Sequence, residues 1–363
     1  MTKINYDQWV QKSLAAERFN QEECRTILDS QEIEILPLLQ AAYTVRKAQW
    51  GNSVNIHIIN NAKNGNCPED CAYCVQAKTS KTQIADYPIK TDDEIMAEAK
   101  NAYESGAFRY CMVFAGRGPT KQRVEKLSGL IQKIKSTYPI QVCLSPGLLD
   151  QEGTDMLKAA GLDRLNHNLN TSERYYPEIC DTHTFQDRLN TLQAAKNSGI
   201  ELCTGMIAGL GEQSDDIIQV AQKLRDVEAQ SIPINFYMAI DGNRLGPKHD
   251  LTPERCLRIL CLFRFINPKS ELRMAAGREM HLRSMQVMGL YPANSLFMDG
   301  YLNTKGTNHA QTLQMIKDAG FDIQSEHNLE DLLEKANEKN LPEINNGEKA
   351  IMKSIEDLRP ARA

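Results

Sequence analysis

The central part of the chain alternates between short runs of hydrophobic and β-branched residues and longer stretches in which hydrophobic residues recur at helical spacing. The alternation begins near residue 53 and repeats about eight times, as expected when strands and helices follow one another. The predicted strands are residues 54–60, 109–115, 140–145, 164–169, 201–208, 232–239, 271–275 and 293–298. Such alternation is typical of a parallel sheet whose crossover connections are helices.

Local signals mark the ends of several predicted helices. Thr91 followed by Glu94 matches the capping-box pattern of a helix start. Glycines follow other helical stretches, where a left-handed residue commonly ends a helix. These glycines are Gly106, Gly161, Gly199, Gly289 and Gly320.

The number of repeats favours a particular architecture. About eight strand–helix units over roughly 270 residues fit a closed (β/α)8 TIM-type barrel better than an open doubly wound sheet, which stays the alternative. We expect residues 1–45 to form a short helical N-terminal lead-in and residues 46–324 to form the barrel. Residues 325–363 are expected to be a peripheral C-terminal tail, a helix and a loose end, without assigned chemistry.

Composition narrows the classes of partner. The net charge of −5 offers no basic surface for nucleic acid. The first residues lack the apolar core of a signal peptide, and no run approaches the roughly 20 apolar residues of a membrane span. Ten cysteines without an export signal indicate a reducing cytoplasm, where they serve as metal ligands or buried thiols. We therefore expect a cytoplasmic protein with neither a nucleic-acid nor a membrane partner.

Three cysteines, Cys67, Cys71 and Cys74, form a C-x3-C-x2-C run directly after the first predicted strand. Three thiolates can hold three irons of a cubane cluster and leave the fourth iron without a protein ligand. A small molecule with adjacent amine and carboxylate groups could chelate that iron. A structural zinc site is the alternative, but it needs four ligands, and the chain has no second C-x2-C pair, while a lone His57 is a poor substitute.

Three further cysteines lie inside predicted strands: Cys111, Cys143 and Cys203. Alone, each would be interpreted as a small buried hydrophobic residue. Because all three can point into one barrel, they indicate a second, smaller cluster. Arg278, just beyond the seventh strand, could be a salt-bridge partner, a substrate clamp or a residue of that metal site. Its guanidinium stays charged, so it would be a weak ligand.

Amide side chains form the next group. Strand alternation places Asn166, Asn168 and Asn170 on one face, and Asn235 on the sixth strand faces the same interior. Buried amides are costly unless they are paired, and a polar ligand would pair them. Arg188 opens a helix at the predicted barrel mouth, where it could bind a carboxylate with two hydrogen bonds or form a surface salt bridge.

Residues 45–322 resemble the biotin synthase family of the radical S-adenosylmethionine (SAM) superfamily. The matching motifs are G-N-C-P-E-D-C-A-Y-C (65–74), R-Y-C-M (109–112), the Cys143 strand, N-H-N-L (166–169), Cys203 with G-L-G-E (209–212), P-I-N (233–235), A-G-R-E (276–279) and A-N-S (293–295). The three-cysteine motif alone would identify only the superfamily, and the strand cysteines with Arg278 narrow it.

The resemblance implies two clusters and a reaction. Three residues, Cys67, Cys71 and Cys74, would bind a [4Fe–4S] cluster whose open iron takes SAM. The ligands of a [2Fe–2S] cluster would be Cys111, Cys143, Cys203 and Arg278. A 5′-deoxyadenosyl radical would abstract hydrogen from dethiobiotin, and sulfide from the second cluster would complete biotin. The activity expected is therefore that of a sulfurtransferase.

The resemblance also implies roles for residues at the barrel mouth. Arg188 would meet the SAM carboxylate and Tyr73 would lie near the adenine. Asn168 and Asn235 would sit near substrate and cofactor. Many family members carry Asp where this chain has Asn170, which leaves the cofactor or substrate contact at 170 without a charge.

Expected partners are dethiobiotin, an external one-electron reductant of the flavodoxin or ferredoxin type, the iron–sulfur assembly machinery and a second copy of the chain in a homodimer. A different radical SAM reaction, such as that of a methylornithine-type mutase or a cofactor-assembly protein, is one alternative. An iron–sulfur electron carrier or a zinc scaffold is another. The remaining cysteines, Cys24, Cys180, Cys256 and Cys261, receive no role, and the last two are expected in the core of one apolar helix.

Overall fold

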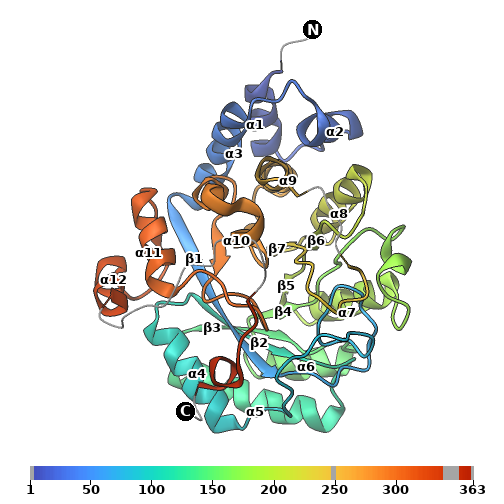
Figure 1. Ribbon diagram of the computed structural model, residues 1–363, viewed down its shortest axis with the longest axis vertical. Helices are drawn as coiled ribbons and strands as arrows, with labels where there is room; N and C mark the ends of the chain where they lie inside the picture. The colour runs from blue at the N-terminus through green and yellow to red at the C-terminus, as the bar shows by residue number, and fades with distance from the viewer. Residues whose placement is uncertain (1–3, 247–250, 338–350, 361–363) are drawn as a thin grey trace.

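Parallel strands close into a barrel at the centre of the molecule (Figure 1). The computed structural model describes residues 4–246, 251–337 and 351–360. The barrel strands are β1 (Ser53–Lys63), β2 (Arg109–Phe114), β3 (Gln141–Ser145), β4 (Arg164–Asn166), β5 (Glu201–Cys203), β6 (Met206–Ala208), β7 (Ser231–Phe236), β8 (Glu271–Met274) and β9 (Ser295–Phe297). Because β1 pairs with both β2 and β9, the sheet closes, which confirms the expected (β/α)8 TIM-type barrel. A short β10 (Asp322–Ile323) pairs with the start of β1.

The fifth predicted strand is broken in two. It was expected to run over residues 201–208, but β5 ends at Cys203 and β6 begins at Met206. At the break, Gly205 packs so tightly that a Cβ atom there would lie 1.9 Å from the carbonyl oxygen of Pro233. Only glycine permits this approach of two backbones, and the close passage interrupts the ladder.

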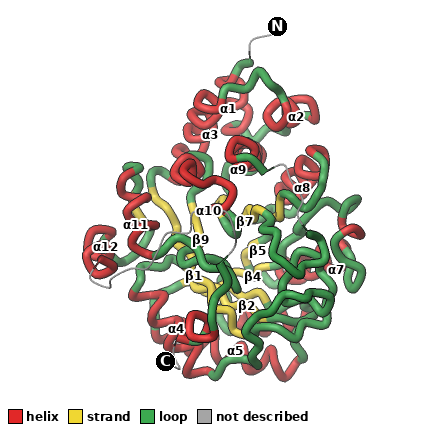
Figure 2. The backbone as a smooth tube through the Cα atoms, in the orientation of Figure 1, coloured by secondary structure: helices red, strands yellow, loops and turns green. Residues whose placement is uncertain are grey.

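Helices surround the strands on the outside (Figure 2). They are α4 (Asp92–Glu104), α5 (Lys121–Thr137), α6 (Gln151–Ala159), α7 (Phe185–Asn197), α8 (Ser214–Asp226), α9 (Pro253–Ile266), α10 (Arg278–Leu282) and α11 (His309–Asp318), with the 3-10 segments η1 (Tyr176–Glu178) and η2 (Arg283–Leu290). The capping box at Thr91 and Glu94 is present at the start of α4. No helix in the described ranges has the length and apolar character needed to cross a membrane.

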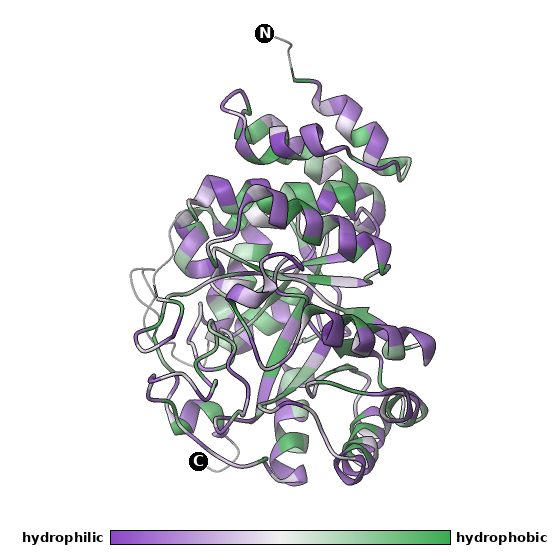
Figure 3. Ribbon diagram, turned by 90° about the vertical axis from the view of Figure 1, so that its right-hand side faces the viewer, coloured by the Kyte–Doolittle hydropathy of each residue, from purple (hydrophilic) through white to green (hydrophobic). Residues whose placement is uncertain are grey.

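Three N-terminal helices cover one end of the molecule (Figure 1). They are α1 (Tyr6–Leu14), α2 (Gln21–Asp29) and α3 (Ile35–Trp50), and all contact α9. Every residue of α9 from Cys256 to Ile266 is buried, because the helix lies between these helices and the barrel. Cys256 and Cys261 are therefore core residues, as expected. Figure 3 shows hydrophobic colouring along parts of the central strands.

The C-terminal part returns to the barrel. After α12 (Leu329–Asn337), the segment 351–360 with α13 (Ile355–Leu358) lies against α4 and the loop after β9. Arg359 forms a buried ion pair with Glu94 at 2.6 Å. The amide of Lys353 donates to the carbonyl of Asn303 over 2.8 Å. Residues 338–350 and 361–363 of the predicted tail lie outside the described residues.

Candidate functional site

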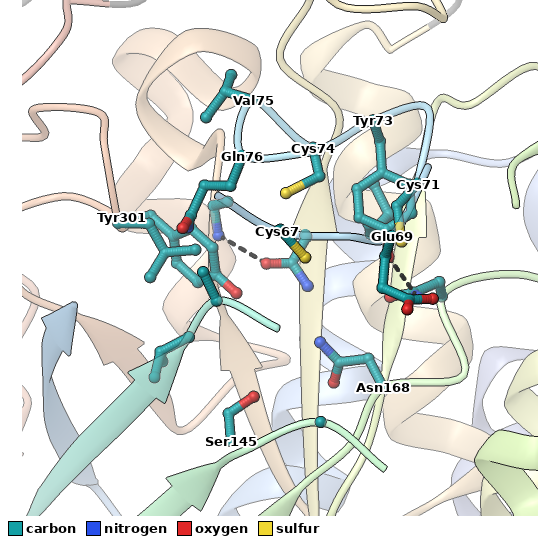
Figure 4. Close-up of a pocket in the computed structure, with 18 of the residues that line it drawn as sticks. Cys67, Glu69, Cys71, Tyr73, Cys74, Val75, Gln76, Ser145, Asn168 and Tyr301 are labelled. Atoms are coloured by element: carbon teal, nitrogen blue, oxygen red, sulfur yellow. Dashed lines mark hydrogen bonds between the residues drawn. The ribbon is translucent and has the colours of Figure 1, made fainter. Parts of the chain in front are cut away.

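A cavity of about 280 Å³ opens at the C-terminal ends of the barrel strands (Figure 4). One wall is the loop that carries Cys67, Cys71 and Cys74, which follows β1 directly. This is the end of a TIM barrel where active sites are built from the loops after the strands. The sequence prediction of a site at this mouth therefore agrees with the position of the cavity.

All three cysteines of the loop line the cavity. Figure 4 shows Cys71 apart from Cys67 and Cys74, on the side of Glu69 and Tyr73. The Cys71 sulfur is 3.9 Å from the sulfur of Cys180. Burial raises the pKa of the Cys74 thiol to about 11, so metal binding at this loop must displace thiol protons.

The three strand cysteines meet inside the barrel, below the cavity. Cys111 on β2 lies opposite Cys143 on β3, and Cys203 on β5 lies opposite Asn166 on β4. Cys111, Cys143 and Cys203 form one buried group together with Phe297. Hydrogen bonding with Cys111, opposed by Cys203 and reinforced by burial, raises the pKa of the Cys143 thiol to about 12. The arrangement supplies three closely placed sulfur ligands that point into one barrel.

The arginine beside these thiols is Arg273, whereas Arg278, which was expected at this site, makes its contacts elsewhere. The Nη1 atom of Arg273 lies 3.7 Å from the Cys203 sulfur. Arg278 instead pairs with Glu279 at 3.0 Å and reaches Thr312 on α11 at 3.4 Å. Gly277, with φ of +76°, ends the strand connection and sends the chain into α10. Arg278 therefore belongs to the helical layer, whereas Arg273 sits within β8 and points inward.

A small space of about 20 Å³ adjoins Arg273 and the cysteine group. Arg273 could have been found from the sequence, because alternation along the seventh predicted strand puts Glu271 and Arg273 on one face. Two charged residues on the interior face of a strand mark a buried polar site. The A-G-R-E motif drew attention to Arg278 instead.

All four predicted amides line the cavity: Asn166, Asn168, Asn170 and Asn235. Strand β4 ends at Asn166, so Asn168 and Asn170 lie in the loop that follows it. Asn166 lies 3.3 Å from the Cys203 sulfur. The side-chain oxygen of Asn168 accepts from the Gly205 amide at 3.1 Å. Asn235 bonds to backbone on both sides, donating to Met206 at 3.0 Å and accepting from Ala276 at 3.2 Å.

Asn170 adopts a left-handed backbone conformation with φ of +69°. Its side-chain amide donates to the hydroxyl of Tyr73 over 2.7 Å, which ties the loop after β4 to the cysteine loop. Asparagine is among the few residues that tolerate this backbone conformation. The amide at 170 therefore serves both the backbone geometry and the position of Tyr73.

Arg188 on α7 lines the same cavity and is buried. It donates to the carbonyl oxygen of Asn168 at 2.9 Å and to Nε2 of His183 at 2.7 Å, and its Nε donates to the hydroxyl of Tyr176. These contacts hold a permanent positive charge beside the cysteine loop. The guanidinium is placed where a carboxylate in the cavity could reach it.

A buried charge network fills the opposite end of the barrel, and the sequence analysis did not anticipate it. Glu271 accepts from Arg109 at 3.1 Å, from Arg164 at 2.8 Å and from His57 at 2.8 Å. Burial opposes ionisation of Glu271, but Arg109, His57 and Arg273 hold the pKa of its carboxyl well below the usual value. Glu271 of this network accepts a hydrogen bond from Arg273 and so fixes that side chain from the N-terminal end of β8.

The donor sets fit two iron–sulfur clusters. Three thiols at the mouth match the ligand count of a [4Fe–4S] cluster with one open iron, and three interior thiols with Arg273 match a smaller cluster. The cavity between them has room for small molecules. Cys71 would have to turn from Cys180 to join Cys67 and Cys74.

The sequence matches the model of the Radical SAM superfamily over residues 63–224 and that of the Biotin and Thiamin Synthesis associated domain over residues 233–322. It is 52% identical over 316 residues to biotin synthase of Acaryochloris marina, covering 87% of this chain and 91% of that protein. It is 54% identical over 298 residues to biotin synthase of Magnetococcus marinus, covering 82% of this chain and 93% of that protein.

Solved structures support the fold independently. Methylornithine synthase superimposes with a TM-score of 0.76 at 18% identity, covering 90% of this chain and 100% of that one. The FeFe-hydrogenase maturase HydG from Carboxydothermus hydrogenoformans gives a TM-score of 0.74 at 19% identity, covering 88% of this chain and 79% of that one. Because relatives about half identical in sequence span most of its length, the chain belongs to the biotin synthase family of the radical SAM superfamily.

Proposed function

We propose that the chain catalyses the last step of biotin synthesis, the radical insertion of sulfur into dethiobiotin. The observation that carries this proposal is the stacking of two thiol sets at two depths of one barrel. The three-cysteine loop forms the upper wall of the cavity, and Cys111, Cys143 and Cys203 lie beneath it. An enzyme that needed only a radical source would not require the lower set.

The residues are assigned as follows. At the mouth, Cys67, Cys71 and Cys74 would hold a [4Fe–4S] cluster, and Arg188 would bind the carboxylate of SAM. Tyr73 lies near the adenine, and Asn168, Asn170 and Asn235 contact substrate and cofactor or hold the loops that do. Below, Cys111, Cys143, Cys203 and Arg273 hold a [2Fe–2S] cluster, with Arg273 taking the place first expected for Arg278.

When bound, the two clusters and SAM supply a carbon radical and the sulfur it captures. The work of the chain is orientation and enclosure. Tyr73 is fixed by Asn170 at 2.7 Å and Asn168 by the Gly205 amide at 3.1 Å, so the cavity walls are held by internal hydrogen bonds. A closed barrel around the reacting atoms excludes water and makes the productive encounter effectively intramolecular.

Arg273 is suited to its place as a charge that cannot be removed by deprotonation. Its Nη2 is held by Glu271 at 2.5 Å and by Ser231 at 2.7 Å, which leaves Nη1 directed at Cys203. A guanidinium fixed in this way offsets the negative charge of thiolates and sulfide around it.

Anaerobic reconstitution with iron and sulfide tests the proposal. Wild type is expected to bind about six irons, and the triple variant Cys111→Ala/Cys143→Ala/Cys203→Ala about four. Wild type should convert dethiobiotin to biotin, whereas the variant should still cleave SAM but form no biotin. If both proteins bind only about four irons, the strand cysteines are core packing and another radical reaction must be assigned.

We also propose a cellular location, an oligomeric state, protein partners and domain bounds for this enzyme. We infer a cytoplasmic homodimer that receives electrons from a flavodoxin- or ferredoxin-type reductant and clusters from iron–sulfur assembly machinery, on the strength of the family resemblance. We retain the division into a lead-in (1–45), a barrel (46–324) and a C-terminal tail (325–363). Light scattering of the purified protein tests the dimer, which a monomer at micromolar concentration would contradict.

A further inference from the structure

A second group of metal-binding side chains lies behind the cysteine loop. It consists of Cys71, Cys180 and His183, and all three are buried. Their ligand atoms lie within 4.8 Å of one another. Cys180 and His183 come from the connection between η1 and α7, so the group joins two distant parts of the chain.

The distances match a tetrahedral site. With metal–sulfur bonds of about 2.3 Å, two thiolates on one tetrahedral zinc lie about 3.8 Å apart, and a thiolate and an imidazole nitrogen about 3.5 Å apart. Here the Cys71 and Cys180 sulfurs are 3.9 Å apart, and the Cys180 sulfur is 3.8 Å from Nε2 and 3.2 Å from Nδ1 of His183. The ligand atoms of Cys71 and His183 lie within 4.8 Å of each other. The side chains therefore need little movement to share one ion.

The imidazole is already oriented for this role. Nδ1 of His183 lies 2.6 Å from a carboxylate oxygen of Glu69. Because Arg188 can only donate to Nε2, Nδ1 carries the proton and donates to Glu69. A carboxylate that receives the outer N–H of a histidine is the usual support of a metal-bound imidazole. A metal ion at Nε2 takes the place now filled by the Arg188 guanidinium.

We propose that the cluster-free protein binds one thiophilic divalent cation, Zn²⁺ or Fe²⁺, through Cys71, Cys180 and Nε2 of His183. Both cysteines bind as thiolates, and binding displaces Arg188 from His183, with no change in oxidation state. Water or the nearby carboxylate of Asp70, whose Oδ1 is 3.3 Å from the Cys180 sulfur, completes the coordination.

The consequence of this site for cluster loading rests on the proposed function, in which Cys71 is a ligand of the [4Fe–4S] cluster. One thiolate cannot serve both sites, so the divalent site and the cluster exclude each other. The same ion also takes Nε2 of His183 from Arg188. The occupied site thus holds the protein in a form that cannot take up the [4Fe–4S] cluster until Cys71 is released.

Anaerobic titration of the cluster-free protein with Co²⁺ is the test, because tetrahedral thiolate-bound cobalt has intense visible bands that Zn²⁺ abolishes. Wild type should bind one equivalent. Cys180→Ser, which keeps the side-chain size, should lower the affinity at least about tenfold, and Glu69→Gln about tenfold by loss of the outer hydrogen bond. The matched control is Cys74→Ser, which should leave the cobalt spectrum unchanged.

Equal loss in Cys74→Ser and Cys180→Ser would overturn the proposal, since the ion would then occupy the three-cysteine loop. An unchanged spectrum in Cys180→Ser would do so as well. Iron uptake separates this result from a failure of the proposed function: Cys180→Ser should still take up about six irons on reconstitution. Wild type pre-loaded with Zn²⁺ should take up only about two, and full uptake would contradict mutual exclusion.

Discussion

Arg273 donates to Glu271 over 2.5 Å, although the two residues stand only two positions apart on β8. Their side chains share the interior face because strand residues alternate. Glu271 at the same time accepts from Arg109 and Arg164, so one carboxylate holds three guanidinium groups. The interior thiols thus rest on an arginine that is itself fixed by a buried acid.

Replacing Glu271 by Gln should strongly destabilise the fold. The substitution leaves Arg109, Arg164 and Arg273 buried without their common counter-charge, which typically costs about 3–5 kcal/mol. Urea unfolding followed by circular dichroism measures the change. Glu201→Gln is the matched control, because it removes only the half-exposed end of the Arg164 pair and should cost less than about 1 kcal/mol. Equal effects of both substitutions would show that the interior network carries no special stability.

Two arginine substitutions should separate the alternative positions for the second cluster. Arg273→Lys keeps the charge but changes the geometry next to Cys203, so we expect an altered [2Fe–2S] absorption spectrum or loss of about two irons. Arg278→Lys should leave iron content and spectrum unchanged, because Arg278 contacts Glu279 and Thr312 instead. The reverse outcome would restore the original expectation for Arg278.

Asn170 should prove to be both a backbone and a positioning residue. Asn170→Ala leaves a β-carbon at φ of +69° without the polar side chain that makes asparagine tolerant of this conformation, and should destabilise the protein by about 1 kcal/mol, whereas Asn170→Gly should not. Both variants lose the hydrogen bond to Tyr73, so SAM binding should weaken about fivefold in each. Equilibrium dialysis of the reconstituted protein measures the affinity. Wild-type affinity in Asn170→Gly would show that this hydrogen bond does not position the cofactor.

Acid should release the C-terminal segment 351–360 from the barrel. Burial opposes ionisation of Glu94, but hydrogen bonds from Thr91 and Arg359 outweigh it and lower its pKa to about 2. Since the unfolded pKa of Glu is about 4.3, the stabilisation is complete above that pH and is lost as the pH falls towards 2. Hydrogen exchange at the amide of Lys353, corrected for intrinsic rates, should increase over this range.

Arg359→Leu provides the reference for the acid experiment. It should exchange rapidly at Lys353 already at pH 6, because the ion pair to Glu94 is absent. The acid-dependent increase seen in wild type should therefore disappear. Identical pH profiles in the two proteins would mean that another group holds the segment.

Features set by neighbouring residues were predicted from the sequence more fully than those set by distant ones. The capping box of Thr91 and Glu94 spans four residues and is present as expected. The break between β5 and β6 depends on Pro233, which belongs to the next strand, so no local signal at Gly205 announces it.

The same distinction applies to the site. The spacing of Cys67, Cys71 and Cys74 identified the mouth of the barrel, because those residues share one loop. Cys180 received no role, since it reaches Cys71 only through the folded chain, 109 positions away. For Arg273 the alternation of strand residues would have sufficed, but a nearby motif directed attention five residues too far.

The charge network at the N-terminal end of the strands has a consequence for assembly. His57, Arg109 and Glu271 are fully buried there and close the N-terminal end of the barrel. Whatever occupies the lowest level must arrive through the same mouth that later receives the other components. We therefore expect the deeper cluster to be inserted first. It can be replaced only after the components at the mouth of the barrel have been removed.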